Sequence, residues 1–310
     1  MALNYAEVWS PDLLEIMEQE SLTSPFVTTA VKWLSAKTFH FTQMSTSGYK
    51  SHSRLGGWNK GTFAQTDVPF TLTHDRDISF LVDKIDVDET NETASIKNIS
   101  EVFHKTQQIP EMDAYFYSKV ATEAQKLDGY HSSTALSSYT KENVYGKLKA
   151  MLSAGKLRRY VAKGALIAYV NSTIMDLLEQ STDFTRKIEM TQIAEGGVGI
   201  ETRITDIDGV TLIEVIDDER FYDKFDFTDG FAPVASTSHK INVLIASPLT
   251  VKTVPKIASI YYFNPGQHTE GDGYLYQDRS LSDTFVFPNG KDNKIDSIYV
   301  DVDTETYSAA

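Results

Sequence analysis

The segment richest in reactive side chains runs from residue 206 to residue 230 and reads DIDGVTLIEVIDDERFYDKFDFTDG. Paired carboxylates can hold a metal ion or act as a general acid and base. A carboxylate-dependent hydrolase would draw on Asp206, Asp208, Asp217 or Asp218. The spacing of an EF-hand is absent, however, and ten acids against three bases between residues 201 and 230 are typical of a solvated acidic face. We therefore favour the acidic face and keep the hydrolase as the alternative from a different class.

Other catalytic and ligand-binding signatures are missing from the sequence. The seven histidines show no i, i+3 or i+4 pairing with another metal-ligating residue in a recognisable motif. The glycine-rich stretch EGGVGIE at 195–201 matches neither phosphate-binding arrangement, and no G-x-S-x-G nucleophile motif occurs. The chain contains no cysteine, which excludes disulfides, thiolate metal sites and a cysteine nucleophile. We therefore predict no catalytic residue, no cofactor and no metal site, and a protein that is not an enzyme.

Length and charge narrow the class of protein. A chain of 310 residues with 41% hydrophobic and 23% charged residues folds as one large domain or two ordinary ones. No window approaches 18 consecutive apolar residues, and the acidic N-terminus is the opposite of a signal or transit peptide. We therefore expect assembly in the cytoplasm and no membrane partner. A net charge of −14 argues against broad nucleic-acid binding, which requires many Lys and Arg side chains.

Residues 48–61, GYKSHSRLGGWNKG, combine four glycines, three basic side chains and a tryptophan without a single acid. On both sides the sequence alternates apolar and polar residues with the period of a β-strand, in KTFHFTQM at 37–44 and in VPFTLT at 68–73. This pattern predicts a β-hairpin with its tip near residues 49–60. Continued alternation in DISFLVDKIDVDE at 77–89 predicts that the return arm is long.

An isolated ribbon of this kind needs support. Arms of about ten residues span roughly 33 Å, and a two-stranded ribbon alone is marginally stable in water. The support comes either from a third strand of the same chain or from another subunit. The glycine-rich basic tip is compatible with the second interpretation at least as well as with the first.

Helices are predicted on both sides of the hairpin. Ser10-Pro11-Asp12 followed by LLEIMEQE predicts a short helix over residues 11–20. After the hairpin, helical periodicity extends over a long stretch that contains Pro110. Because proline interrupts helices, we expect one helix near residues 96–107 and a second over residues 110–126.

The second half of the chain mixes strands and helices. The apolar stretch ALIAYV predicts a strand that leads into a helix capped by Asn171 or Ser172. Further strands follow from Lys240 to the end of the chain. This order of elements predicts the α+β fold class.

The order of these features resembles that of the major capsid protein of tailed bacteriophages, the HK97-like fold. The same resemblance extends to local sequences such as TSPFVTTAVKWLSAKTFHF and DIDGVTLIEVIDDERF. In that family an N-terminal arm is followed by an extended β-hairpin called the E-loop, a peripheral domain with a long spine helix, an α/β axial domain, and strands that complete the peripheral domain. The resemblance implies a division into the N-terminal arm (1–35), the E-loop hairpin (36–88), the peripheral domain (89–129 and 256–303) and the axial domain (130–255).

The resemblance also implies a structural function. The chain would be a major capsid protein that self-assembles into the icosahedral shell enclosing the double-stranded DNA genome of a tailed phage. It would be located in the virion after assembly in the host cytoplasm. Its partners would be many copies of itself as pentamers and hexamers, a separate scaffolding protein and a portal, with no sequence-specific contact to the DNA. Within the same fold, the shell protein of an encapsulin-like nanocompartment is the alternative.

The hairpin tip and the N-terminal arm are the predicted contact sites between subunits. Glycines allow tight turns, basic side chains pair with acids, and an aromatic side chain anchors a contact. The predicted contacts at the tip are Tyr49, Lys50, Arg54, Trp58 and Lys60. Those of the arm are Trp9, Asp12, Glu15 and Glu18. The acid-only residues 1–20 and the acidic segment 206–230 are the candidate receiving surfaces.

Overall fold

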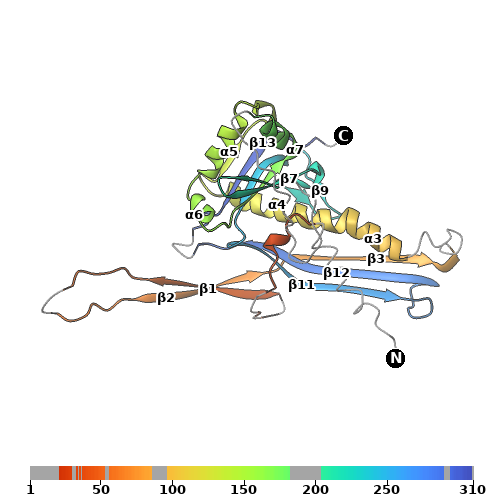
Figure 1. Cartoon of the computed structure of the whole chain (residues 1–310). Coiled ribbons are helices and arrows are strands. Elements are labelled where there is room, and N and C mark those ends of the chain that lie inside the picture. The colour runs from red at the N-terminus through yellow and green to blue at the C-terminus, as the bar shows by residue number, and fades with distance from the viewer. Residues whose placement is uncertain are drawn as a thin grey trace.

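The computed structural model describes residues 21–29, 33, 35, 37–52, 56–85, 96–181, 204–289 and 294–308. A wedge-shaped upper body rests on a long helix, and beneath the helix lies a long, flat layer of strands (Figure 1). From one end of this layer a two-stranded ribbon projects away from the body. The helix predicted over residues 11–20 lies outside the described residues.

The helical elements comprise α-helices and short turns of other helix types. The α-helices are α3 (Ile96–Phe103), α4 (Ile109–Gln125), α5 (Val144–Leu152), α6 (Arg158–Val161) and α7 (Ser172–Glu179). A π-helical turn is η2 (His104–Gln108), and the 3₁₀ turns are η1 (Ser24–Phe26), η3 (Leu136–Ser138) and η4 (Asp218–Arg220). None of the helices in the described part of the chain has the length and apolar character that a transmembrane segment requires.

The strands form four separate sheets. A two-stranded sheet pairs β1 (Thr38–Thr46) with β2 (Phe63–Thr71). A three-stranded sheet has the order β11 (Val251–Phe263), β12 (Gly273–Val286), β3 (His74–Asp83). A six-stranded sheet has the order β4 (His131–Ser133), β13 (Ile298–Thr306), β10 (His239–Ala246), β5 (Ile167–Asn171), β7 (Val210–Val215), β6 (Ile204–Ile207). The smallest sheet pairs β8 (Phe225–Asp226) with β9 (Ala232–Pro233).

The upper body is built around the six-stranded sheet, together with α5, α6 and α7. Its central strands read as continuous apolar runs because both of their faces are covered, as in the buried stretch from Ile241 to Ala246 of β10. Helices α5 and α7 cover one face, and α4 covers the other. The predicted strand and helix near residue 171 are confirmed: the Asn171 side chain caps α7 by accepting a 3.0 Å hydrogen bond from the backbone N–H of Thr173.

The predicted break at Pro110 is wrong, because α3, η2 and α4 form one continuous helical run (Figure 1). Proline cannot donate the usual i to i−4 hydrogen bond, and the π-helical turn just before it changes the bonding pattern there. Within this turn the backbone N–H of Ile109 bonds the carbonyl of His104, and the Thr106 hydroxyl donates to the Val102 carbonyl at 2.7 Å. The widened turn therefore lets the helix continue through the proline.

Helix α4 is buried around most of its circumference. Phe116, Val120 and Ala124 form a buried apolar stripe, but Ala114, Tyr115 and Ser118 on other faces are buried as well. The reason is that α4 lies between the six-stranded sheet and the three-stranded sheet and packs on both. A single helix thus joins the two main layers of the molecule.

Strand β3 belongs to the three-stranded sheet and not to the hairpin. It pairs along its whole length with β12, from Gly273↔Asp83 to Ser282↔His74. Its inward side chains pack beneath the helix, where the ring of Phe80 lies 5.5 Å from Phe103 and 6.2 Å from Tyr276. The expectation of a return arm reaching to residues 77–89 is therefore corrected: the hairpin ends at Thr71, and the chain crosses into another sheet.

Two buried ionisable groups lie where the long helix meets the three-stranded sheet. Burial raises the pKa of Asp278 from 3.8 to about 6, beside the Tyr276 hydroxyl that also contacts His104 Nε2 at 2.9 Å. His74, whose ring stacks on Tyr115 at 3.9 Å, has its pKa lowered from 6.5 to about 4, by burial first and then by the charge of Arg76. The two groups therefore favour folding at opposite ends of the same pH range.

Replacing Asp278 should unmask the pH dependence of His74. The contribution of Asp278 to stability is complete below pH ~4 and is lost as the pH rises through about 6, because its pKa is raised on folding. The contribution of His74 is complete above pH ~6.5 and is lost as the pH falls through about 4. At about 1.4 kcal/mol per pKa unit, each amounts to roughly 3 kcal/mol, and the two oppose each other.

The measurement is the free energy of unfolding in urea at pH 4 and at pH 6.5. Lowering the pH over this range should destabilise Asp278→Asn by about 3 kcal/mol more than the wild-type protein. His74→Phe, which preserves an aromatic ring against Tyr115, should change the pH dependence in the opposite direction. Parallel profiles for Asp278→Asn and the wild type would contradict the prediction.

Candidate functional site: the projecting ribbon

The ribbon formed by β1 and β2 is an antiparallel pair with no third strand among the described residues. Its register runs without interruption from Thr38↔Thr71 to Thr46↔Phe63. Beyond the last strand pair, the backbone N–H of Ser47 still donates to the Thr62 carbonyl at 2.8 Å. The ribbon extends away from the upper body and from the helix (Figure 1). The described part of the chain therefore does not supply the lateral support that a long ribbon needs.

The root of the ribbon is fixed by an aromatic cluster. Phe39 is buried, stacks on Phe70 across the strands at 5.6 Å, and meets Phe285 of β12 edge-on at 5.2 Å. Phe287 and Leu72 complete the contact with the body. Such ring pairs add about 0.5–1.5 kcal/mol each beyond the area that they bury, so the direction in which the ribbon leaves the body is set by packing.

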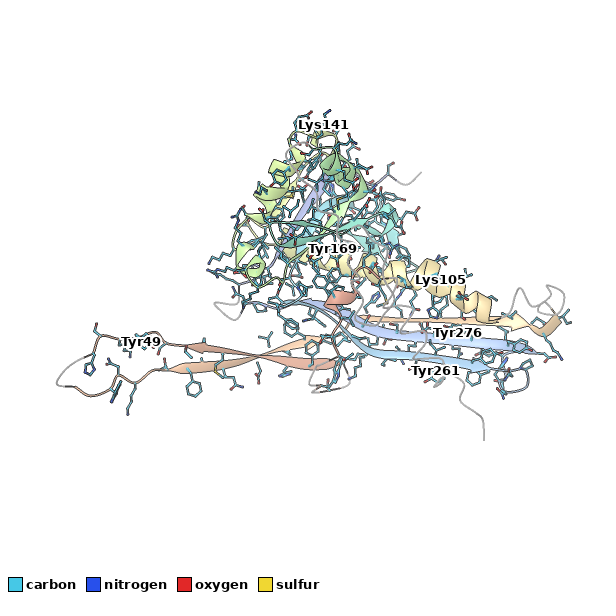
Figure 2. The ribbon with its side chains drawn as sticks, viewed as in Figure 1. Tyr49, Lys105, Lys141, Tyr169, Tyr261 and Tyr276 are labelled. Atoms are coloured by element: carbon cyan, nitrogen blue, oxygen red, sulfur yellow. The ribbon has the colours of Figure 1, made fainter. Side chains whose placement is uncertain are left out.

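Four of the five predicted contact residues of the tip lie among the described residues, and all four are exposed. The Trp58 side chain is 95% exposed and Tyr49 is fully exposed, at the outer end of the ribbon (Figure 2). Lys50 and Lys60 are also exposed, whereas Arg54 lies outside the described residues. Large aromatic side chains left in water are unusual on a monomer and are typical of a contact surface.

Local hydrogen bonds shape the backbone of the tip. The Asn59 side-chain amide donates to the Ser51 carbonyl at 2.9 Å and so links the two arms. Gly57 adopts φ +64°, a conformation that glycine favours. The ring centroids of His52 and Trp58 lie 6.3 Å apart. The described residues of the tip thus expose Tyr49, Lys50, Trp58 and Lys60 to solvent.

The opposite end of the long layer carries the opposite charge. We call it the far end: Asp83 at the close of β3 and the turn at 264–272 between β11 and β12. Asp83, Glu270 and Asp272 are exposed there against one exposed lysine, Lys84, and Leu81 beside them is an exposed apolar side chain. Sequence reasoning did not identify this turn as a contact surface. The signal was its acids, which strand pairing brings next to Asp83.

The acidic segment 206–230 is not the continuous solvated face that we expected. Asp223 is fully buried, where it accepts from the backbone N–H of His239 at 2.7 Å and from the Gln125 amide at 2.8 Å. Glu214 is also buried and accepts from the Ser172 hydroxyl at 2.9 Å. These carboxylates form internal hydrogen bonds. The prediction that the whole segment is one surface that receives another subunit is therefore corrected.

The four aspartates of the hydrolase alternative do not converge. Asp206 lies near the end of β6, where it accepts from the Gly209 N–H at 2.7 Å, and Asp208 lies in the turn before β7 and pairs with Lys149 at 3.3 Å. At the other end of β7, Asp217 bonds Arg220 and Asp218 pairs with Lys240. Within the described residues, no group of three or more potential metal ligands occurs. Each carboxylate has a structural partner, and the two pairs are separated by a strand.

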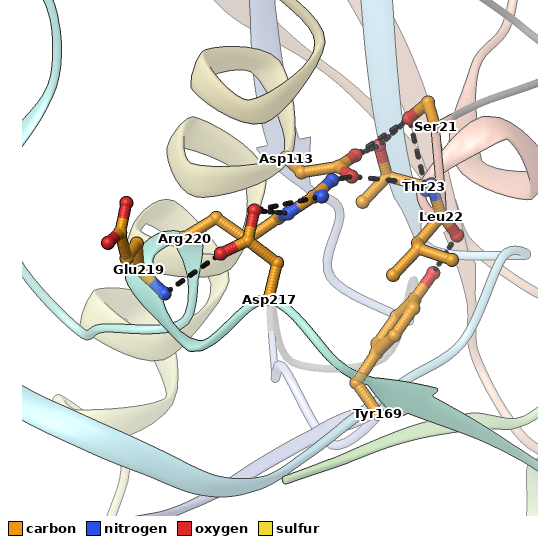
Figure 3. A network of polar contacts seen from close by, with 8 residues as sticks. All are labelled: Ser21, Leu22, Thr23, Asp113, Tyr169, Asp217, Glu219 and Arg220. Carbon is orange, nitrogen blue, oxygen red and sulfur yellow. Dashed lines mark hydrogen bonds and ion pairs between the residues drawn. The ribbon is translucent and has the colours of Figure 1, made fainter. Parts of the chain in front are cut away.

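A buried carboxylate fixes residues 21–23, which lie within the predicted N-terminal arm (Figure 3). Asp113 of α4 is fully buried and accepts from the Ser21 and Thr23 hydroxyls, both at 2.7 Å. Arg220 pairs with the same carboxylate at 3.0 Å, and the Tyr169 hydroxyl donates to the Leu22 carbonyl at 2.7 Å. Sequence reasoning missed this clamp. The predicted arm contacts Trp9, Asp12, Glu15 and Glu18 lie outside the described residues.

Comparison by sequence gives no match: no protein-family model matches the chain, and no curated protein matches it. Comparison of structures does give matches. The chain is similar to the mature capsid protein of bacteriophage PhiM1, with a TM-score of 0.60 at 13% identity over 93% of this chain and 88% of that one. It is also similar to the capsid of cyanophage P-SCSP1u, with a TM-score of 0.61 at 11% identity over 93% and 89% of the two chains.

A structure from Mycobacterium phage Ogopogo is similar as well, with a TM-score of 0.55 at 8% identity over 92% of both chains. Likeness at this level of identity establishes the fold. The chain has the HK97-like fold, and the prediction of an α+β protein of this architecture is confirmed.

Proposed function

We propose that this chain is a major capsid protein, which self-assembles into the icosahedral shell around the double-stranded DNA of a tailed phage. The observation that carries the proposal is the ribbon: its root is packed on the body, its length lacks support in the described chain, and its tip exposes Tyr49 and Trp58. A fold similar to phage capsid structures gives this ribbon a ready explanation.

We infer that the chain divides into the four parts that the resemblance implies. The N-terminal arm would be 1–35, the E-loop 36–88, the peripheral domain 89–129 with 256–303, and the axial domain 130–255. Strand pairing refines two of these boundaries. The E-loop ribbon ends at Thr71, and β13 joins the sheet of the upper body.

In the shell, the ribbon tip would contact another copy of the chain. Burying one exposed tyrosine or tryptophan side chain removes roughly 150–250 Å² from water, which at about 25 cal/mol per Å² stabilises the contact by several kcal/mol. Exposed ion pairs of Lys50 and Lys60 contribute ~0–1 kcal/mol each. The aromatic side chains would therefore hold the contact, and the basic ones would select the acidic far end of a neighbour.

The chain would act without catalysis. The carboxylates that a hydrolase would need are engaged in turns, ion pairs and hydrogen bonds. Its partners would be further copies of itself in pentamers and hexamers, a separate scaffolding protein and a portal, and its final location would be the virion.

The test is the size and content of what the full-length chain forms. We expect the expressed protein to assemble into megadalton rings, sheets or shells, visible by size-exclusion chromatography and negative-stain electron microscopy. Particles from infected cells should contain DNA, whereas a packaged protein in its place would point to an encapsulin-like compartment. A small oligomer at every concentration would overturn the proposal.

A further inference from the structure

The two ends of the six-stranded sheet lie on opposite sides of the upper body. Strand β5 is parallel to β7 and antiparallel to β10, which is itself antiparallel to β13. The first residues of β5, β7 and β13 therefore lie at one end of the sheet, together with the last residues of β10. The last residues of β5, β7 and β13 lie at the other end. In Figure 1, α6 lies at the first end and β9 at the second.

The first end is basic. Between residues 141 and 163 the chain has seven basic residues and one acid, although its net charge is −14. We define the basic end by its exposed bases, which are Lys156, Arg158, Arg159, Lys163 and Lys294. Among the described residues, Lys156, Lys163 and Lys294 have no side-chain partner, and Arg159 reaches the buried Asp296 only at 3.9 Å.

Acids at the same end do not neutralise it. Asp208 is paired with Lys149 at 3.3 Å, and Asp206 accepts the backbone N–H of Gly209. Among the described acids at this end, Asp296 is buried and accepts from the Tyr160 hydroxyl at 2.6 Å. A surplus of positive charge therefore faces solvent.

The second end is acidic. We define the acidic end by its exposed acids, which are Glu219, Asp226, Asp229 and Glu305. Backbone hydrogen bonds join Tyr307 to Ser236 and to Ser238. They hold the end of β13 beside residues 236–238. Of the nearby bases, Arg220 and Lys240 are already paired with Asp113, Asp217 and Asp218. Lys224 is exposed and donates to the Thr237 carbonyl at 3.4 Å, so the exposed acids of this end still outnumber it. A surplus of negative charge therefore faces solvent on this side.

Both ends also expose large apolar side chains. Ile216, just after β7, is 71% exposed, and Val234, just after β9, is also exposed. At the basic end, Leu249 follows β10 and is exposed beside the loop that leads into β5, where the Ser247 hydroxyl bonds the Ala165 carbonyl at 2.7 Å. Each end thus combines charge with an apolar side chain, as protein contact surfaces do.

The charges of the basic end and the acidic end cannot pair with each other within one molecule. Five residues of β5 alone separate them by about 17 Å at the usual strand rise, and ionic screening weakens exposed charges beyond roughly 8–10 Å. They can meet only when the basic end of one copy faces the acidic end of the next. A contact between two different surfaces of the same chain repeats head to tail, and it forms a closed ring when the rotation from one copy to the next closes.

We propose that the upper bodies of neighbouring copies contact each other head to tail, with the basic end of one subunit against the acidic end of the next. The proposal rests on the proposed function, because a shell of pentamers and hexamers requires such closed rings. Opposite charges set the register and the choice of partner, and Ile216, Val234 and Leu249 supply apolar surface. Duplex DNA would also be attracted to the basic end, but it would leave the acidic end and these apolar side chains without a partner.

Three matched variants test the contact. Lys156→Glu, Lys163→Glu and Lys294→Glu together reverse the basic end at positions whose side chains have no partner among the described residues. Glu219→Lys, Asp229→Lys and Glu305→Lys together reverse the acidic end. Each triple variant should place like charges against each other and lower the fraction of chain in particles by about tenfold or more. The six-fold variant restores opposite charges and should recover most of the assembly.

The readouts are sedimentation velocity, electron microscopy and the DNA content of the particles, with thermal unfolding to check that each monomer is folded. Mixing the two triple variants gives a second measurement, since the reversed basic end of one then meets the reversed acidic end of the other with opposite charges, and assembly should recover in part. Normal particles from either triple variant, or a six-fold variant no better than the triples, would overturn the inference. Normal particles with less DNA would likewise overturn it and assign the basic end to nucleic acid. If the wild-type chain forms no particles, the proposed function itself fails.

Discussion

Deleting residues 49–60 is expected to leave a folded, soluble protein that no longer assembles into shells. The structure favours this deletion because Ser47 and Thr62 are still hydrogen-bonded across the ribbon, at 2.8 Å. Removing the tip joins Gly48 to Gly61 and leaves a Gly-Gly turn of two residues between paired strands, which is a preferred hairpin connection. The aromatic root at Phe39 is untouched. Circular dichroism and chromatography of the monomer would check folding, and electron microscopy would check assembly.

Point variants separate the two forces proposed for the tip. Tyr49→Ser with Trp58→Ser removes the aromatic surface and retains the basic charge. Lys50→Gln with Lys60→Gln removes charge and retains the aromatic surface. Because apolar burial outweighs exposed ion pairs, the first pair should lower particle yield far more than the second, and the second should mainly change the salt dependence of assembly. Shells of normal size from the deletion variant would contradict a contact function for the tip.

The hairpin could be predicted because its signal is local. Alternation around Phe39 and Phe70 places these side chains on one face, and the glycine-rich tip between the arms marks the turn. The extent of the return arm could not be predicted, because β3 alternates with the same period as β2. Only pairing with β12, about 200 residues later in the chain, assigns β3 to another sheet. The far end with Asp83 is acidic for the same long-range reason.

The continuous helix through Pro110 and the clamp at Asp113 were missed for different reasons. Proline statistics favour a break, and the alternative depends on a π-helical turn that no residue pattern announces. An aspartate within a helical stretch ordinarily faces solvent. Asp113 is buried because Ser21, Thr23 and Arg220 converge on it from sites about 90 to 107 residues away in the chain. Contacts between residues so far apart in the chain leave no periodic pattern in the sequence.

Asp113→Ala should lower the free energy of unfolding by about 3–5 kcal/mol, which is the usual cost of removing one partner from a buried ion pair. The change leaves the Ser21 and Thr23 hydroxyls without their acceptor and removes the partner that Arg220 finds at 3.0 Å. Tyr169 would still hold the Leu22 carbonyl. We therefore expect the segment around residues 21–28 to open locally, with faster hydrogen exchange, in addition to the global loss of stability.

Asp217→Ala is the matched control, because Asp217 binds the same guanidinium group from a side chain that is 41% exposed, whereas Asp113 is 0% exposed. An exposed pair contributes ~0–1 kcal/mol, so this variant should unfold in urea close to the wild-type midpoint and leave the exchange of residues 21–28 unchanged. Asp113→Asn retains an acceptor oxygen and should fall between the two if Asp113→Ala does not fold. Equal losses for Asp113→Ala and Asp217→Ala would mean that the buried carboxylate does not anchor the chain at the root of the N-terminal arm, and that the arm is held there by the packing of Phe26 against Phe116 at 4.7 Å.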